Sequence, residues 1–324
     1  DFKVDWDWEL PIKIDLMRRD FTINAIAQSL RDGSMVDPCL GANDIHTRVL
    51  KMVFPGTFRD DPLRILRGVR FATRFGLTIE EETRKGMTRY AELVDTISAE
   101  RIQEELNKLL LQCERPSEGF ALMYDIDVLR EVMIELHRAY GVTQNEHHPD
   151  DVFWHSVKSC DAAPRDNLVV RWAALLHDIG KVDAKQVVVS EDGSEKTVFY
   201  RHERYGAVMA ALLLQRLRYS NDFTRRVVHL VEHHMFFYRS EWTRATVRRF
   251  IRRVGEDHLE DLFLLRRADC KSRDKTDELE PLEELRERID RELEDSRVFK
   301  IGDLAVDGKD VIDLTGVAPG PDVG

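Results

Sequence analysis

Residues 58–76 read FRDDPLRILRGVRFATRFG, and this stretch decides the fold class that we expect. Asp60 and Asp61 place acids at a helix start, Pro62 stands just inside that start, and Gly76 supplies a stop. The residues between Pro62 and Gly76 follow a helical pattern, and strand signals become sparse from Asp60 onward. The sequence therefore predicts a mainly α chain from about residue 60.

The segment before this helix, residues 21–53, has a different pattern. It alternates loosely between apolar and polar residues, with turn signals at Asp32-Gly33 and at Asp37-Pro38. We expect a strand pair followed by a short helix from about Asn43. This part of the chain therefore resembles the end of an α+β domain.

Downstream of residue 76, helices dominate the expected fold. Ser98 opens a helix that runs through about Gln112, and residues 116–140 supply one or two more. The polar, turn-rich segment GVTQNEHHPDD, residues 141–151, is the best internal domain boundary. A second helical block follows, interrupted by a hairpin at residues 187–200 and continued by a charged helix at residues 274–296.

Composition limits the classes of protein to consider. A chain of 324 residues is expected to form two or three domains, and no apolar run is long enough to cross a membrane. The four cysteines are far apart and form no C-x-x-C, which argues against disulfides and a cysteine zinc site. We expect a cytoplasmic protein with no membrane partner. The net charge of −11 argues against a nonspecific nucleic-acid coat, although arginines are bunched in three places.

The first group of candidate functional residues lies at the start of the helix quoted above. Asp61, Arg64 and Arg67 are three residues apart and share one helical face, with Asp61 in the first turn. A carboxylate accepts from an exocyclic amino group, while a guanidinium donates to the ring nitrogen beside it. Such a pair would accept cytosine and adenine and refuse guanine and uracil. The alternative is that Asp61 caps the helix and the arginines pair with local acids.

The second group is a series of histidines and aspartates in the second helical block. It contains His155, the adjacent His177 and Asp178, His202, the pair His233 and His234, and Asp269. Imidazole and carboxylate groups together form a mixed nitrogen and oxygen shell, which suits Mn, Fe, Ni, Co or Mg better than a structural zinc. A metal in such a shell would activate water to attack a phosphate ester.

Three segments in the first half resemble a known family. RRDFTINAIA (residues 18–27), DPCLGANDIHTRVLKMV (residues 37–53) and FRDDPLRILRGVRFATRFG occur in the order of the motifs of class II tRNA nucleotidyltransferases and poly(A) polymerases. The resemblance covers roughly residues 9–135. It implies that Arg19, Asp20 and Asn24 hold the ribose and triphosphate of the incoming nucleotide. Asp61 and Arg64 would form the template for the base, with Arg67 close by.

The same resemblance bears on Asp5 and Asp7, which form a D-x-D pattern near the start of the sequence. In the family, the metal-binding D-x-D lies in an earlier strand, behind a glycine-rich stretch and well upstream of the R-R-D-F-T segment. Asp5 and Asp7 therefore resemble decoys, and no catalytic carboxylate for nucleotidyl transfer is assigned. We expect a chain that begins partway through the catalytic head, stops before the family's last helix, and does not transfer nucleotides by itself.

The second half resembles the HD superfamily of metal-dependent phosphohydrolases, over about residues 148–272. The order H…HD…D, with AALLHDIGK at residues 173–181, carries this resemblance. It implies four primary metal ligands: His155, His177, Asp178 and Asp269. His202 and His234 would hold a second metal or the substrate phosphate, and Lys181 would contact phosphate. The alternative is an HD fold retained for RNA binding or dimer contacts, because a fold does not establish a function.

Together these expectations give a domain order and a function. Residues 1–52 would be the C-terminal part of a nucleotidyltransferase head, 53–145 an all-α neck and body, 146–273 an all-α HD domain with a small hairpin insertion, and 274–324 a tail. The leading hypothesis is a bacterial tRNA nucleotidyltransferase with an HD module. It would add C and/or A from CTP and ATP to the tRNA 3′ end at the acceptor stem, with Mg²⁺ for the transfer.

Other functions stay open at this point. The chain could act as an HD phosphodiesterase or phosphatase on nucleotide or RNA-end phosphates, with a divalent transition metal or Mg²⁺. It could also belong to a bacterial poly(A) polymerase, or be an RNA-binding fragment without turnover. The residues do not choose between addition of C, A, CCA or a poly(A) tail, and they leave the oligomeric state open.

Overall fold

The computed structural model describes residues 10–144, 150–189, 195–298 and 308–316. The chain divides into two compact units, of which the first comprises Asp1–Met235 and Glu260–Lys275, and the second Phe236–Leu259 and Thr276–Gly324. Among the described residues, helices predominate and the strands form only two-stranded sheets. The prediction of a mainly α protein is therefore confirmed. No helix in these ranges has the length and apolar content needed to cross a membrane.

The N-terminal segment contains the predicted strand pair and short helix. Its elements are α1 (Ile12–Met17), η1 (Thr22–Asn24), the antiparallel strands β1 (Ala27–Gln28) and β2 (Met35–Val36), and α2 (Gly41–Thr47). The helix begins at Gly41 rather than near Asn43, because the Asp37 carboxylate accepts the N–H groups of Gly41 at 2.8 Å and Ala42 at 2.9 Å. A Cβ at Gly41 would lie 2.0 Å from the carbonyl oxygen of Thr22, so close packing requires glycine here.

The quoted stretch forms two helices rather than one. α3 (Thr57–Asp60) ends before Asp61, and α4 (Leu63–Phe75) follows Pro62 and ends at Gly76, whose φ is +59°. Asp61 adopts an extended conformation with φ −146° and ψ 98°, because the ring of the following proline disfavours the helical conformation. The expectation that Asp61 lies in the first turn of the long helix is therefore wrong.

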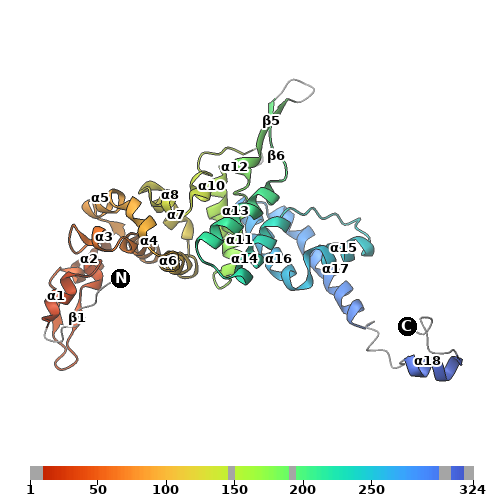
Figure 1. Cartoon of the computed structure of the whole chain (residues 1–324), viewed down its shortest axis with the longest axis horizontal. Helices are drawn as coiled ribbons and strands as arrows, with labels where there is room; N and C mark the ends of the chain where they lie inside the picture. The colour runs from red at the N-terminus through yellow and green to blue at the C-terminus, as the bar shows by residue number, and fades with distance from the viewer. Residues whose placement is uncertain (1–9, 145–149, 190–194, 299–307, 317–324) are drawn as a thin grey trace. The chain divides into compact units, whose positions relative to one another are not determined.

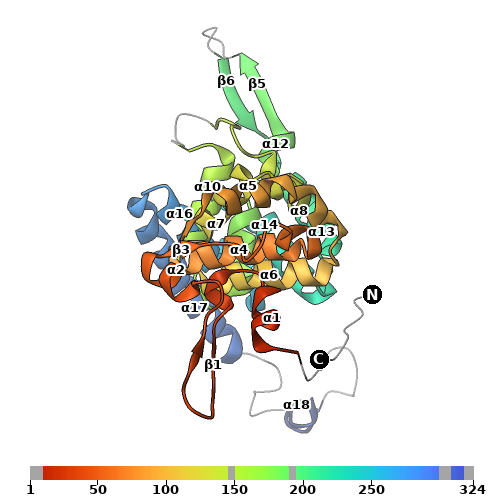
Figure 2. The ribbon, with the colours of Figure 1, turned by 90° about the vertical axis from the view of Figure 1, so that its left-hand side faces the viewer.

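The apolar face of α4 forms part of the core with the helices that follow it. Ile65, Leu66, Val69 and Ala72 of α4 are buried. α4 packs against α6 (Ala99–Gln112) and α7 (Pro116–Asp125), and these three helices lie side by side in Figures 1 and 2. The remaining elements of this part are β3 (Val49–Leu50), which pairs in parallel with β4 (Thr78–Ile79), then α5 (Glu81–Arg89), η2 (Ala91–Thr96), α8 (Val128–Val132) and α9 (Ile134–His137).

Residues 116–140 form three helices, one more than predicted. The break between α7 and α8 falls at Asp127, which has a φ of +62°, and the break between α8 and α9 falls at Met133. A left-handed residue ends an α-helix because its backbone turns the chain out of the helical path.

The second helical block begins with α10 (Val152–Ala162) and α11 (Leu168–Leu176), followed by α12 (Lys181–Ala184). The predicted hairpin is confirmed as β5 (Lys185–Val189) paired antiparallel with β6 (Glu195–Phe199), which Figure 1 shows leading from α12. Its turn at Asp192-Gly193 lies outside the described residues. α13 (His202–Arg216), α14 (Asn221–His233) and α16 (Glu256–Ser272) complete the block.

The second unit is described by itself. It contains α15 (Arg244–Val254), the first residues of α16, η3 (Thr276–Glu278), α17 (Leu279–Val298) and α18 (Gly308–Thr315). The predicted charged helix corresponds to α17, which begins at Leu279 rather than residue 274. α15 packs against α17, and the buried side chains of this pair include Val247, Phe250 and Leu285.

Candidate active sites

A first cavity, of about 480 Å³, lies at the N-terminal end of α4. The residues come from the η1 region, the junction before α4, α4 itself and the first turn of α6, because the packing of α4 on α6 brings these segments together. The cavity is lined by all six residues predicted for nucleotide binding and by three others: Arg19, Asp20, Asn24, Asp61, Arg64, Arg67, Leu63, Phe71 and Arg101.

Asp20 organises one side of this cavity. Its side chain is buried, and Oδ1 accepts the backbone N–H of Phe21 at 2.8 Å and the Asn24 amide at 3.1 Å. Oδ2 receives Arg67, at 2.8 Å from Nε and 2.7 Å from Nη2. Asp20 therefore fixes the positions of Asn24 and Arg67. Arg19 donates to the carbonyl of Asn24 at 3.0 Å, which ties the third predicted residue to the same group.

Asp61 and Arg64 lie on the other side of the first cavity and do not pair with each other. Asp61 Oδ1 accepts the N–H of Leu63 at 3.3 Å, so the predicted capping role of Asp61 is present as well. Asp61 Oδ2 receives Arg101 Nη2 at 2.9 Å. Arg64 donates to the Arg18 carbonyl at 2.9 Å and to Thr57 Oγ1 at 3.1 Å, rather than to a local acid. Its guanidinium is therefore oriented by backbone and hydroxyl oxygens.

Arg101 is a residue of this cavity that the sequence analysis missed. It lies in the first turn of α6, forty positions after Asp61, and reaches the carboxylate only because α6 packs on α4. No periodicity or spacing in the sequence links two residues this far apart. The helix start at Ser98 predicts that Arg101 lies early in a helix, but it does not predict which residues the Arg101 side chain contacts.

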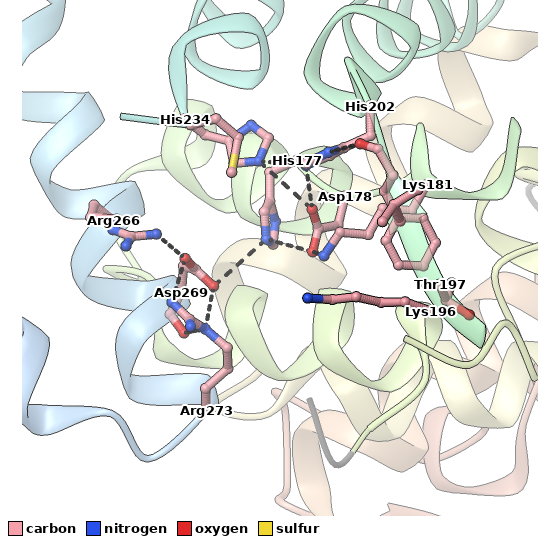
Figure 3. A pocket seen from close by; sticks show the side chains of 13 residues that line it. His177, Asp178, Lys181, Lys196, Thr197, His202, His234, Arg266, Asp269 and Arg273 are labelled. Atoms are coloured by element: carbon pink, nitrogen blue, oxygen red, sulfur yellow. Dashed lines mark hydrogen bonds and ion pairs between the residues drawn. The ribbon is translucent and has the colours of Figure 1, made fainter. Parts of the chain in front are cut away.

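A second cavity, of about 360 Å³, lies in the second helical block (Figure 3). It is lined by six of the seven residues predicted for metal or phosphate and by seven others: His177, Asp178, Lys181, His202, His234, Asp269, Lys196, Thr197, Val198, Phe199, Met235, Arg266 and Arg273. The seventh, His155, is buried next to two of the lining residues. Its Nε2 is 3.3 Å from Asp178 Oδ2 and 3.3 Å from Asp269 Oδ1.

Five elements supply these ligand candidates. His155 lies in the first turn of α10, and His177 and Asp178 stand at the end of α11. His202 is the first residue of α13, His234 follows the last residue of α14, and Asp269 belongs to α16. Helix ends bring these side chains together because α10, α11, α13 and α14 pack as neighbours. His233 points elsewhere: its ring stacks on His229 and its Nδ1 lies 2.9 Å from the His229 carbonyl.

Asp178 joins two groups of nitrogen ligands. Asp178 Oδ2 faces His155 Nε2 at 3.3 Å and His177 Nε2 at 3.4 Å, and these three residues form one candidate metal triad. Asp178 Oδ1 faces His202 Nε2 at 3.2 Å and His234 Nε2 at 3.7 Å, and these form a second triad. The two oxygens of one carboxylate are therefore placed to serve two adjacent metal positions.

The contacts of the histidine Nδ1 atoms, which point away from Asp178, show whether the site fits a metal. Nδ1 lies near a backbone carbonyl in three of them: Ala174 for His177 at 2.8 Å, Phe199 for His202 at 2.9 Å and Val231 for His234 at 2.7 Å. A carbonyl accepts only a protonated Nδ1, so each of these rings would bind a metal through Nε2. Metal-ligating histidines are held in this way, and the donor set therefore fits divalent metal ions.

The charges around the two carboxylates keep both of them ionised. Burial opposes ionisation, but Lys181 and the neighbouring histidines hold the pKa of Asp178 well below its usual range. Lys181 Nζ lies 2.6 Å from Asp178 Oδ2 and donates to Gln144 at 2.7 Å. Burial likewise opposes ionisation of Asp269, while His155 and Arg273 help to hold its pKa well below the usual range. Burial lowers the pKa of His177 to about 3, so this ring is neutral near pH 7.

Asp269 is held by two arginines that the sequence analysis did not include. Arg266 donates to Oδ2 at 2.7 Å, and Arg273 donates to Oδ1 at 3.0 Å and to Oδ2 at 2.9 Å. A signal for both was present, because residues three before and four after Asp269 share its helical face. The remaining prediction near a site, that Asp5 and Asp7 are decoys, falls outside the described residues.

Three family models match the chain. The poly(A) polymerase head domain matches residues 7–51, the probable RNA and SrmB-binding site of polymerase A matches residues 76–140, and the HD domain matches residues 145–274. Among solved structures, the CCA-adding enzyme of Bacillus stearothermophilus in complex with CTP has a TM-score of 0.59 at 23% identity. That similarity covers 97% of this chain and 67% of the other, and it shows a shared fold.

Curated relatives give the family. The A-adding tRNA nucleotidyltransferase of Deinococcus radiodurans is 34% identical over 96% of this chain and 72% of its own length. The multifunctional CCA protein of Methylobacillus flagellatus is 36% identical over 77% of this chain, and the match covers 60% of that protein. The second cavity is lined by residues of the segment that matches the HD domain, and the first cavity includes residues of the segment that matches the polymerase head. The chain therefore belongs to the tRNA nucleotidyltransferase and poly(A) polymerase family and also contains an HD domain.

Proposed function

We propose that the protein containing this chain adds C and/or A from CTP and ATP to the 3′ end of tRNA. The observation that carries this proposal is the first cavity, where six residues assigned to nucleotide binding line one space. The relatives support the reaction class, since one is named an A-adding tRNA nucleotidyltransferase and another a multifunctional CCA protein. A tRNA acceptor stem as partner and a cytoplasmic location are parts of the same proposal.

The chain's own residues would select and position the nucleotide. Asp61 would accept the exocyclic amino group of cytosine or adenine, and Arg64 would donate to the adjacent ring nitrogen. Arg101, which donates to Asp61 Oδ2 at 2.9 Å, would hold this carboxylate in place. Arg19, Asn24 and Arg67 would bind the ribose and triphosphate. Mg²⁺, when bound by the complete protein, would stabilise the charge that develops at the α-phosphate during nucleotidyl transfer.

Binding of the four nucleoside triphosphates to this chain tests the template. We expect CTP and ATP to bind at least about tenfold more tightly than GTP and UTP, because a lost charge-assisted hydrogen bond costs about 1.5 kcal/mol or more. Asp61→Ala should remove this preference without removing binding of the triphosphate group. Equal affinities of the unaltered chain for all four nucleotides would contradict an Asp61 and Arg64 template.

Product lengths test the reaction itself. The complete protein is incubated with tRNAs that end at the discriminator base, at C and at CC, with each nucleotide supplied separately. Ordered addition of C or A that then stops supports a tRNA nucleotidyltransferase and identifies its step. Long A tails would instead support a poly(A) polymerase, and no addition would reject transfer.

A second candidate function is hydrolysis of phosphate esters at the second cavity. The orientation of the histidine Nε2 atoms favours it. His155, His177, Asp178 and Asp269 would hold one divalent ion, and His202 and His234 would hold a second with Asp178. Bound Mn²⁺, Ni²⁺, Co²⁺, Fe²⁺ or Mg²⁺ would supply an activated water and polarise the phosphoryl group. Lys181, which lines the cavity, would neutralise part of the charge on Asp178 and on the phosphate.

Hydrolysis of a 2′,3′-cyclic nucleotide by this chain tests the second function. The chain is freed of metal with a chelator, reloaded with each divalent metal in turn, and assayed for a phosphomonoester product. We expect turnover with at least one of these metals and none in the chelator. Turnover that is unchanged in Asp178→Ala would show that the reaction takes place elsewhere.

A further inference from the structure

The second cavity is lined by four cationic side chains, three of which are paired with a carboxylate of the candidate metal site. Lys181 is bound to Asp178, and Arg266 and Arg273 are bound to Asp269. The fourth is Lys196. Among the described residues, no hydrogen-bond acceptor or ion-pair partner of the Lys196 ammonium group is found. Lys196 is therefore the cationic side chain of this cavity for which the described part of the chain supplies no acidic partner.

Lys196 belongs to the hairpin rather than to the helices that carry the metal ligands. Figure 3 shows its side chain extending from β6 into the cavity, on the side where Asp269 and Asp178 lie. The strand is fixed by its pairing with β5, in which Lys196 stands opposite Val188 and Phe199 opposite Lys185. The backbone of Lys196 is thus held, while its long side chain can follow a ligand in the cavity.

The position of Lys196 favours binding of a ligand's phosphate group over pairing with a carboxylate of the protein. Lys196 is exposed and lines the cavity. Asp178 and Asp269 are already paired with other cationic side chains, so the Lys196 ammonium group is available to bind an anionic ligand. A phosphate ester is the anion that the metal candidates would attract, and it has several oxygens that can be shared between a metal and an ammonium group. Phe199, on the same strand, adds an apolar side chain to the lining of the cavity.

We propose that Lys196 is a further phosphate-binding residue of the second cavity, contributed by the hairpin, and that it holds the substrate's phosphoryl group against the metal ligands. This inference rests on the proposed phosphohydrolase function and names a residue that its ligand set does not include. Because Lys196 would bind the phosphate equally in the ground state and the transition state, its loss should raise KM more than it lowers kcat.

Steady-state kinetics of the full chain loaded with Mn²⁺ tests this role. The substrates are 2′,3′-cyclic AMP and bis-p-nitrophenyl phosphate, and the variants are Lys196→Ala, Lys196→Glu and Lys196→Arg. We expect KM to rise about tenfold in Lys196→Ala and further in Lys196→Glu, with kcat within about threefold of the unaltered chain. Lys196→Arg should restore most of the affinity. The inhibition constant of inorganic phosphate should rise in parallel with KM.

The matched control is Lys185→Ala. Lys185 begins the other strand of the same hairpin, its Nζ donates to Thr143 Oγ1 at 3.0 Å, and it does not line the cavity. Its replacement should leave KM unchanged. A Lys196→Glu variant that keeps both KM and the phosphate inhibition constant would overturn the proposal. So would an equal rise of KM in Lys185→Ala, since that result would point to general destabilisation of the hairpin.

A separate measurement distinguishes failure of this inference from failure of the proposed function. Calorimetric titration of Mn²⁺ and then of inorganic phosphate into the full chain requires no turnover. If the chain hydrolyses neither substrate yet binds phosphate, and Lys196→Glu loses phosphate but keeps Mn²⁺, the hydrolase function fails and the Lys196 site stands. If the unaltered Mn²⁺-loaded chain binds no phosphate, the Lys196 site is rejected.

Discussion

At the scale of single residues, Asp178 connects the two candidate metal triads. One of its oxygens faces His155 and His177, and the other faces His202 and His234. Its replacement therefore removes a ligand from both positions. It also leaves the buried ammonium group of Lys181 without its acidic partner, which destabilises the site.

Asp178→Ala should abolish tight binding of both metal ions and reduce any phosphoesterase activity by at least about a thousandfold, because removal of the bridging ligand affects both sites. Metal content by mass spectrometry and the cyclic-nucleotide assay measure these effects. The control is Asp183→Asn, which changes a surface aspartate paired with Arg138 one turn after the HD pair. Retention of two metals per chain in Asp178→Ala would refute a bridging role.

Arg101 acts on the first cavity through its contact with Asp61. Arg101→Ala should weaken binding of CTP and ATP by about fivefold to tenfold, because Asp61 then loses the guanidinium that orients its carboxylate. Binding of GTP and UTP should change much less, since these bases do not present an amino group to Asp61 in the same way. Arg84→Ala, which removes an exposed arginine near Asp125, serves as the control in the same fluorescence titration.

At the scale of elements, the C-terminal end of α6 is closed by two arginines from the second helical block. Arg171, on α11, is buried and donates to the carbonyls of Leu110 and, at 3.2 Å, Cys113. Arg165 donates to the carbonyls of Leu111, at 2.9 Å, and Gln112. The last carbonyls of a helix have no partner within it, so these contacts stabilise α6 and join it to α11.

Arg171→Ala should lower the free energy of unfolding by about 3 kcal/mol, because it leaves buried carbonyls unpaired and opens a cavity. Arg165→Ala removes a similar pair of contacts at an exposed position and should cost only about 0.5 kcal/mol. Urea denaturation followed by circular dichroism measures both. Equal losses in the two variants would argue that burial does not determine the strength of these caps.

In the second unit, the pairing of α15 with α17 depends on Glu292. Its side chain is buried and receives Arg244 and, at 2.5 Å, Arg248. The hydrogen bond from Arg244 lowers the pKa of Glu292, burial opposes this change, and Arg248 adds to the lowering. A carboxyl group whose pKa is lowered on folding stabilises the fold above its ordinary pKa of 4.5, and this stabilisation is lost as pH falls below that value.

Glu292→Gln should therefore reduce the melting temperature at pH 7 and flatten its decrease between about pH 5 and pH 3. Thermal unfolding followed by circular dichroism across this range provides the measurement. Glu287→Gln is the matched control, because Glu287 lies one turn earlier on α17 in an exposed pair with Arg291, and such pairs contribute little. A pH profile of Glu292→Gln identical to that of the unaltered chain would contradict this account.

At the scale of the whole molecule, the two cavities lie in the same compact unit and share no lining residue among those that the structure describes. Substitutions at distant sites without common partners usually have additive effects on free energy. Asp61→Ala and Asp178→Ala should therefore combine additively: the first changes nucleotide preference alone and the second metal binding alone. Nucleotide and metal titrations of the double variant measure this, and strong coupling would indicate communication between the cavities.

Metal binding should also stabilise the whole first unit. A ligand that binds only the folded state at a hundred times its dissociation constant adds about 2.7 kcal/mol. Mn²⁺ or Ni²⁺ should therefore raise the melting temperature of the unaltered chain, a chelator should reverse the change, and Asp178→Ala should not respond. Differential scanning calorimetry is the measurement. An equal rise in Asp178→Ala would place the stabilising metal outside the second cavity.

The local sequence determined where several helices and strands begin and end. Gly76 ended α4, Ser98 opened α6, and the β-branched runs on either side of Asp192-Gly193 produced the paired strands of the hairpin. Backbone conformation and capping act over a few residues, so these features follow from the order of the side chains alone. The resemblance to the family also pointed to six of the residues that line each cavity.

Contacts between distant segments were decided only by the tertiary structure. The exclusion of Asp61 from α4 is a local effect of Pro62, but only the packing of α6 on α4 gave Asp61 its partner, Arg101. The packing of helix ends placed Asp178 between two histidine pairs, and the hairpin brought Lys196 into the same cavity. Residue order fixes which groups the chain carries and where its helices begin and end. Which groups face each other depends on how buried apolar faces pack, and that packing is a property of the whole fold.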